Sequence, residues 1–184
     1  LNSGSLAAIA AVARRHDIAI IENDVLGPLI EDRPPPVAAF APERTLYVTS
    51  FTKTVLPGLR TGYLAVPDRM LSAVMNRHLV TNWIATPLIA ELATRWVADG
   101  TALELVRWQR QALRRRQEVV AEMLAGIPYR AHREGLHLWL PLETPEAEEL
   151  FVAQARLRGV AVAPGRSFQM GAIRQPAVRV SVGS

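Results

Sequence analysis

Residues 45–66 read TLYVTSFTKTVLPGLRTGYLAV, and this stretch decides the fold. Its first part, 45–49, is rich in β-branched, aliphatic and aromatic residues, a composition that favours a strand. A Pro-Gly pair then breaks the chain, and residues 60–66 return to a strand-like composition. The sequence therefore predicts a strand, a polar connection and a second strand.

The candidate binding side chains of this segment are Ser50, Lys53 and Arg60, the last at the start of the second predicted strand. Of the 21 lysine and arginine residues in the chain, only Lys53 is a lysine. A guanidinium stays protonated, whereas a lysine amine can act as a nucleophile, so the single lysine indicates a position that needs an amine. An aldehyde that carries a phosphate needs such an amine, together with hydroxyl and guanidinium donors for the phosphate. The alternatives are codon bias that left one lysine and a solvated basic loop.

The rest of the chain reads as an α/β unit followed by a smaller α+β unit, joined by a long helix. Helices are expected at about 4–16, 68–80, 87–98, 102–125 and 144–159. Strands are expected at 17–21, 45–49, 60–66, 160–163 and 178–182, with extended segments within 128–142. The first strand is nearly all aliphatic, which is typical of a parallel sheet covered on both faces. Residues 27–44 are expected to be mostly loop.

Composition excludes several classes of protein. The chain is 49% hydrophobic and 21% charged with a net charge of +4, as in soluble globular domains. No apolar run approaches the roughly 20 residues that span a bilayer. Cysteine is absent, which excludes disulfides and thiolate sites, and the four histidines lack metal-ligand spacing. We expect a cytoplasmic protein without a membrane partner or a metal.

Two further places carry candidate binding residues. Asn23 and Asp24 follow the first predicted strand, and the carboxyl ends of parallel strands are where α/β folds contact ligands. A merely polar strand end is the alternative. Arg179 stands alone in an otherwise apolar strand, so it either faces solvent or binds an anion, for which its planar fork suits a carboxylate.

The segment 50–63, S-F-T-K-x-x-x-P-G-L-R-x-G-Y, resembles the Schiff-base lysine segment of fold-type I aminotransferases, which depend on pyridoxal 5'-phosphate. It is closest to the form found in MocR-type transcription regulators and their free-standing aminotransferase relatives. The resemblance implies that Lys53 forms the Schiff base and that Ser50 and Arg60 bind the cofactor phosphate. It also implies that Arg179 holds the substrate carboxylate.

The strand end departs from this resemblance twice. The family usually reads E-D-D-x-Y-G here; the first aspartate pairs with the pyridine nitrogen, and the tyrosine contacts the phenolic oxygen. In this chain Asn23 takes the place of that aspartate, with Asp24 next to it, and Leu26 takes the place of the tyrosine. Asn23 and Asp24 both remain candidates for the cofactor contact. An asparagine supplies no negative charge to raise the pKa of the ring nitrogen.

The resemblance covers the whole chain and implies two parts. Residues 1–100 correspond to the later half of the large cofactor domain, with a mixed, mostly parallel sheet, and residues 101–184 to an interdomain helix and the small α+β C-terminal domain. The intact homodimeric parent is expected to move amino groups between an amino acid and a 2-oxo acid. The alternative is an effector- or cofactor-sensing domain of a MocR-type regulator with little turnover, contacting DNA only through a domain absent from this chain. The chain begins at Leu1, so we expect a fragment that is inactive by itself.

Five arginines form a basic face on the helix expected at 102–125: Arg107, Arg110, Arg114, Arg115 and Arg116. Positive charge gives phosphate affinity, so a nucleic-acid surface is one interpretation. Acidic residues interleave with these arginines, and no aromatic platform accompanies them, which favours a solvated helix face.

Overall fold

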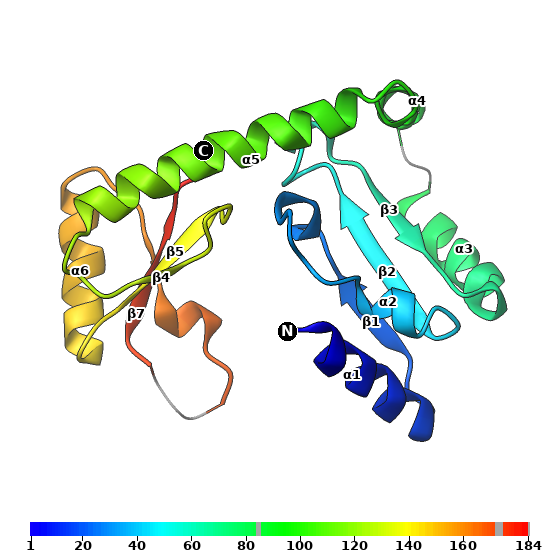
Figure 1. Ribbon diagram of the computed structural model, residues 1–184, viewed down its shortest axis with the longest axis horizontal. Coiled ribbons are helices and arrows are strands. Elements are labelled where there is room, and N and C mark those ends of the chain that lie inside the picture. The colour runs from blue at the N-terminus through cyan, green and yellow to red at the C-terminus, as the bar shows by residue number, and fades with distance from the viewer. Residues whose placement is uncertain (84–85, 172–174, 184) are drawn as a thin grey trace. The chain divides into compact units, whose positions relative to one another are not determined.

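The computed structural model describes residues 1–83, 86–171 and 175–183. It divides into two compact units, Leu1–Gln109 and Arg110–Ser184. The division falls inside the long helix α5, Thr101–Met123 (Figure 1). The domain boundary after residue 100 stays a prediction.

Unit 1 contains a three-stranded sheet in the order β1-β2-β3. Its strands are β1 (Ile20–Asn23), β2 (Thr45–Ser50) and β3 (Gly62–Ala65). The β1–β2 pair is parallel and the β2–β3 pair is antiparallel, so the sheet is mixed. The helices of this unit are α1 (Ser3–Arg15), α2 (Val37–Phe40), α3 (Asp68–Asn82) and α4 (Pro87–Ala98), with short 3-10 helices η1 (Gly27–Leu29) and η2 (Pro57–Leu59).

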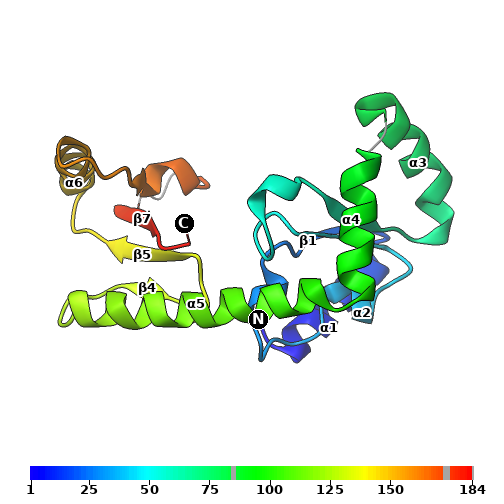
Figure 2. The ribbon, with the colours of Figure 1, turned by 90° about the horizontal axis from the view of Figure 1, so that it is seen from above.

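Helices α1 and α2 cover one face of this sheet (Figures 1 and 2). Leu6 and Ala10 of α1 pack with Val37 of α2 in a buried cluster that Ile20 of β1 joins. The opposite face is more open, because the next residue of β1, Ile21, is 75% exposed. The expectation that the first strand is covered on both faces is therefore wrong for this chain, since only alternate side chains of the strand meet the helices.

Unit 2 contains an antiparallel sheet in the order β4-β5-β7-β6. Its strands are β4 (Arg130–Ala131), β5 (His137–Pro141), β6 (Ala163–Pro164) and β7 (Ala177–Ser181). Helix α6 (Pro145–Leu157) and the 3-10 helix η3 (Gly165–Phe168) complete it. Leu138, Leu140 and Val178 form its buried core, against which Val120 of α5 and Val152 of α6 pack.

Local sequence signals explain most boundaries. The hydroxyl of Thr144 accepts a hydrogen bond from the Ala147 N–H at 3.2 Å and so caps the start of the helix predicted at 144–159. The strand predicted from residue 17 begins only at Ile20, because Asp17 has a left-handed backbone with φ 50° and ends the first helix in a turn. The predicted loop 27–44 contains η1 and α2, and the strand predicted at 160–163 is reduced to β6.

Among the described helices, none combines the length and apolar character needed to cross a membrane. Within the same described ranges, no group of three or more histidine, aspartate or glutamate side chains is arranged to hold a metal ion.

Candidate functional site

The lysine lies on a compact turn at the end of β2. The Phe51 carbonyl accepts hydrogen bonds from the backbone N–H groups of Val55 at 2.9 Å and Leu56 at 3.0 Å. Thr54 is buried, and its hydroxyl donates to the Ser50 carbonyl at 3.0 Å. The turn is thereby fixed from inside, and Lys53 projects from it as an exposed side chain.

Arg60 lies where the connection returns to the sheet. It follows η2 and has a left-handed backbone, with φ 48° and ψ 31°. For a residue other than glycine this conformation costs on the order of 1–3 kcal/mol, and such strain is common at ligand-binding positions. The next residue, Thr61, accepts a hydrogen bond from the Phe51 N–H at 3.2 Å, so the two ends of the connection lie side by side. Arg60 is exposed, like Lys53.

Ser50 and Gly62 are direct partners in the β2–β3 ladder. A Cβ atom on Gly62 would lie 2.6 Å from the Thr49 carbonyl oxygen and 2.9 Å from the Ser50 Cβ. The glycine is therefore required for close approach of the two strands at the serine. The ladder and the turn place a hydroxyl, an amine and a guanidinium on one short connection, and their role in binding stays a prediction.

The two polar residues at the end of β1 differ in exposure and in hydrogen-bond partners. Asn23 is exposed, and its side-chain carbonyl oxygen accepts from the Val25 N–H at 3.4 Å. Asp24 is largely buried, with 16% of its side chain exposed. Its carboxylate accepts a hydrogen bond from the Tyr47 hydroxyl at 2.6 Å and forms an ion pair with Arg33.

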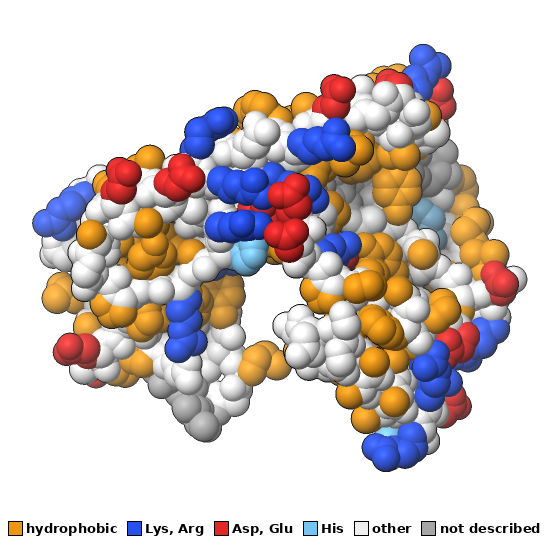
Figure 3. All heavy atoms as spheres, in the orientation of Figure 1, with side chains coloured by type: hydrophobic (Ala, Val, Ile, Leu, Met, Phe, Trp, Pro, Cys, Tyr) orange, Lys and Arg blue, Asp and Glu red, His pale blue; other side chains and the backbone are white. Residues whose placement is uncertain are grey.

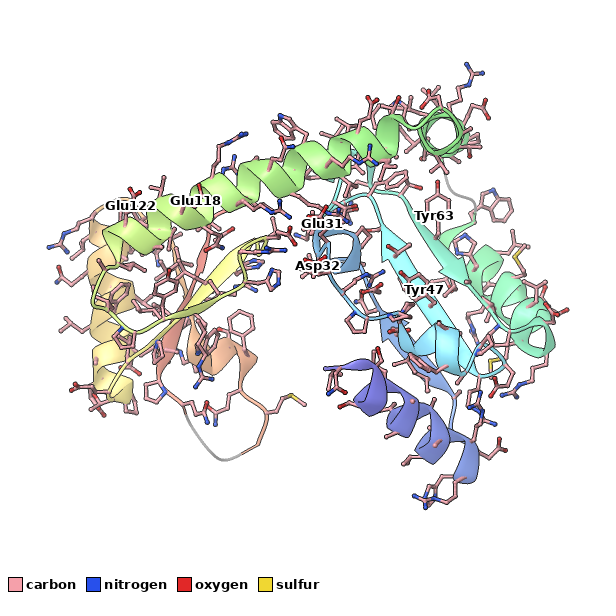
Figure 4. The ribbon with its side chains drawn as sticks, in the orientation of Figure 1. Glu31, Asp32, Tyr47, Tyr63, Glu118 and Glu122 are labelled. Carbon is pink, nitrogen blue, oxygen red and sulfur yellow. The ribbon has the colours of Figure 1, made fainter. Side chains whose placement is uncertain are left out.

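Tyr47 and Arg33 are site-adjacent residues that the sequence did not single out. Burial first, and then the hydrogen bond to the Asp24 carboxylate, raise the pKa of Tyr47 above its ordinary value of 10.0, so the phenol is protonated and donates. Tyr47 comes from β2 and Tyr63 from β3, and both are labelled in Figure 4. Leu26, at the position of the expected family tyrosine, is 43% exposed and has no polar group.

Arg179 belongs to unit 2, on β7, where it is paired with Trp139 of β5 and Ala163 of β6. Its guanidinium carbon lies 4.4 Å from the centre of the Phe168 ring. The Phe168 and Trp139 rings lie edge to face, with their centres 5.9 Å apart. A guanidinium stacked on an aromatic ring keeps the donors at its edge available for a planar anion.

A cavity of about 300 Å³ is lined by Trp139 and Phe168, the aromatic residues near this arginine, together with Gly165, Gln169, Met170 and Gln175. Glu148 of α6 is fully buried in the same unit. The Glu148 carboxylate accepts a hydrogen bond from the backbone N–H of Ala177 at 3.0 Å and lies 3.5 Å from the guanidinium of Arg166. Glu148 thus links α6 to η3 and to the start of the strand that carries Arg179.

The basic face of α5 is partly structural. Arg114 forms an ion pair with Glu134, a fully buried carboxylate. Arg116 donates to the backbone carbonyl of Val182 at 3.2 Å. Figure 3 shows acidic as well as basic side chains on this helix, and Figure 4 labels two of them, Glu118 and Glu122. These contacts favour a structural and solvated role over a nucleic-acid surface.

Comparison with known proteins identifies the fold to which this geometry belongs. The whole chain, residues 1–184, matches the family described as aminotransferase class I and II. The chain belongs to this family. The predicted resemblance and fold class are thereby confirmed.

Curated relatives of this aminotransferase-family chain include both regulators and aminotransferases. Two uncharacterized HTH-type transcriptional regulators of Bacillus subtilis, YdeF and YisV, are 29% and 30% identical to it. The matches cover 95% and 85% of this chain but 38% and 34% of the regulators, so the chain spans about a third of their length. An uncharacterized aminotransferase of Saccharolobus solfataricus is 26% identical over 91% of this chain and 44% of its own.

Solved structures agree on the fold. A kynurenine aminotransferase of Pyrococcus horikoshii superimposes with a TM-score of 0.89 at 19% identity, covering 100% of this chain and 48% of that protein. An aromatic aminotransferase of Pyrococcus horikoshii OT3 gives a TM-score of 0.84 at 26% identity, with 100% of this chain and 51% of that protein covered.

Proposed function

We propose that this chain supplies the lysine-bearing part of a pyridoxal 5'-phosphate site in a protein that transfers amino groups between an amino acid and a 2-oxo acid. The observation that carries the proposal is the β2–β3 connection, where Ser50, Lys53 and Arg60 share one short turn whose ends are joined by the Phe51–Thr61 hydrogen bond. When bound, the cofactor supplies an aldehyde and an electron-withdrawing ring. The donor set on the connection fits such a group.

Each residue has a distinct proposed role. The Lys53 amine would hold the cofactor aldehyde and would serve as the general base for the α-proton of the substrate. Ser50 and Arg60 donate to the phosphate, for which a hydroxyl and a guanidinium are suited. Asn23 and Asp24 are the candidates for contact with the cofactor ring, and Arg179 holds the substrate carboxylate.

The proposed organisation follows the two halves of the chain. Residues 1–100 form part of the large cofactor domain and residues 101–184 the interdomain helix and small domain. We also propose a cytoplasmic homodimer. An apolar stripe on α3 supports a second copy as partner, since Leu71, Met75 and Leu79 recur every four residues and are 48%, 60% and 51% exposed.

A second function is the effector domain of an HTH-type regulator that binds the cofactor and an amino acid with little turnover. Two observations favour it. The relatives that are 29% and 30% identical carry regulator names. The chain also places Asn23 and Leu26 where the family pattern has an acid and a phenol.

The test uses the complete gene product that contains this chain. Pyridoxal phosphate is added to wild type and to Lys53→Arg, which keeps the charge but loses the nucleophilic amine. We expect a visible absorption band that only wild type develops. Amino-group transfer is then measured with a panel of amino acids and 2-oxo acids. Turnover supports the transferase, whereas a Lys53-dependent band without turnover supports the effector domain. Identical spectra for the two proteins would refute both.

A further inference from the structure

The two polar residues at the end of β1 lie on opposite faces of the sheet. Residues paired across neighbouring strands point to the same side, and successive residues alternate. Glu22 is paired with Tyr47 and Asn23 with Val48. Glu22 lies on the helix-covered face, because its carboxylate accepts from backbone N–H groups of α2 at 2.8 and 2.9 Å. Asn23 therefore lies on the open face.

The phosphate-binding candidate Ser50 lies on that same open face. Val48 and Ser50 are two residues apart on β2, so both share the side of Asn23. Asp24, the next residue, points to the opposite face of the sheet. Its backbone N–H donates to the Val48 carbonyl at 2.8 Å, which continues the ladder by one residue, and its carboxylate reaches the Tyr47 hydroxyl on the helix-covered face. Asn23, and not Asp24, thus lies on the same face of the sheet as Ser50.

The Asp24 carboxylate is already bound by two neighbouring side chains. Arg33 neutralises its charge, and Tyr47 donates to the same carboxylate oxygen. The backbone of Gly27 lies so close beneath this pair that a Cβ there would overlap the Asp24 carboxylate and the Arg33 guanidinium. The carboxylate therefore fastens the loop after β1 to β2. A carboxylate already paired with a guanidinium has little field left to protonate another group.

The amide of Asn23 is oriented as a donor. Its side-chain oxygen accepts from the Val25 N–H, and a backbone N–H can only be matched by an acceptor. The amide NH₂ group is thereby left to donate outward. An NH₂ donor matches a pyridine nitrogen that carries no proton, because only that form has a lone pair to accept the bond.

We infer that Asn23 donates a hydrogen bond to the unprotonated ring nitrogen of bound pyridoxal phosphate, while Asp24 serves only to anchor the loop to β2. The inference rests on the proposed function, since it requires that the cofactor binds at Lys53. An unprotonated ring withdraws electrons weakly, so the inference favours the second proposed function, an effector domain with little turnover, over amino-group transfer.

The test reads the ring nitrogen directly. The complete gene product is loaded with pyridoxal phosphate labelled with ¹⁵N in the ring, and the nitrogen resonance is compared with free cofactor above and below its ring-nitrogen pKa. Wild type should give the unprotonated position. Asn23→Asp should move the resonance to the pyridinium position, and Asp24→Asn should leave it unchanged. Because Asn23 is exposed, its substitution does not threaten folding, so Asn23→Asp decides even where Asp24→Asn does not fold.

The possible failures are separable. A pyridinium signal in wild type, or an Asn23→Asp signal that does not move, overturns the inference while borohydride labelling of Lys53 still upholds the proposed function. Absence of cofactor labelling at Lys53 overturns the proposed function and the inference together.

Discussion

Gly62 lies directly opposite Ser50 in the β2–β3 ladder, with no room for a side chain between the strands. The requirement for glycine at this position is therefore steric, and its backbone φ is not in the left-handed region. This contact fixes the spacing between the strand that ends at the serine and the strand that follows the arginine.

Gly62→Ala should destabilise the protein and weaken phosphate binding. Its Cβ would meet the Thr49 carbonyl oxygen at 2.6 Å, and overpacking of this kind costs about 1–3 kcal/mol. Gly58→Ala is the matched control, because nothing lies within 4 Å of its Cβ position. Urea unfolding and titration with inorganic phosphate compare the two. Equal effects of both substitutions would show that the close approach at Ser50 is unimportant.

Arg60→Gly should separate stability from binding. Glycine adopts the left-handed backbone of residue 60 without strain, so the free energy of unfolding should stay the same or rise by up to about 1 kcal/mol. Loss of a charge-assisted hydrogen bond of about 1.5–3 kcal/mol should weaken cofactor binding at least tenfold. Thermal melting and equilibrium dialysis measure the two effects. A less stable variant with unchanged cofactor affinity would contradict a phosphate role for Arg60.

Glu148→Gln should destabilise unit 2 by about 1–3 kcal/mol. The substitution replaces a fully buried carboxylate by a neutral amide and so weakens the hydrogen bond from the Ala177 N–H. Glu149→Gln is the neighbouring control. Its side chain is 63% exposed and its carboxylate lies 3.8 Å from Arg166, so its effect should stay within about 0.5 kcal/mol. Chemical unfolding of both variants provides the comparison, and a negligible effect at Glu148 would argue against its bridging role.

The contribution of Glu43 should depend on pH. The hydrogen bond from Arg14 lowers the pKa of Glu43 from 4.5 to about 2. Because the pKa is lower in the folded state, the ionised carboxylate stabilises the protein above the unfolded value of 4.5. This stabilisation is lost as pH falls towards 2. The stability difference between wild type and Glu43→Gln should therefore shrink over that window, and added salt should reduce it because the pair is exposed. A difference that is independent of pH would contradict this assignment.

Much of the fold could be predicted because its signals are local. The strand predicted at 45–49 and the helix that begins after Thr144 depend on neighbours in the chain, and the structure has both. The strand predicted at 60–66 is shorter, Gly62–Ala65, because Arg60 has a left-handed backbone that cannot continue a strand. The predicted start of β1 at residue 17 was wrong, because an aliphatic run does not reveal the left-handed backbone of Asp17. Exposure of Ile21 also has no local signal, since an aliphatic residue reads as buried wherever it stands.

The contacts around the candidate site were harder to predict. Tyr47 meets Asp24 across 23 positions of sequence, and Arg33 approaches the same carboxylate from a loop. Nothing in the sequence distinguishes the buried Glu148 from the exposed Glu149 beside it. Such pairs depend on strand register and helix packing, which a single sequence does not display.

Reductive trapping tests the central claim most directly. Within residues 1–184 only Lys53 has a side-chain amine, so a peptide that carries reduced cofactor identifies its site of attachment unambiguously. The complete gene product is incubated with pyridoxal phosphate, reduced with borohydride, digested and analysed by mass spectrometry. We predict stoichiometric phosphopyridoxyl labelling of Lys53 that excess inorganic phosphate diminishes. Labelling spread over other amines, with Lys53 unmodified, would contradict the account.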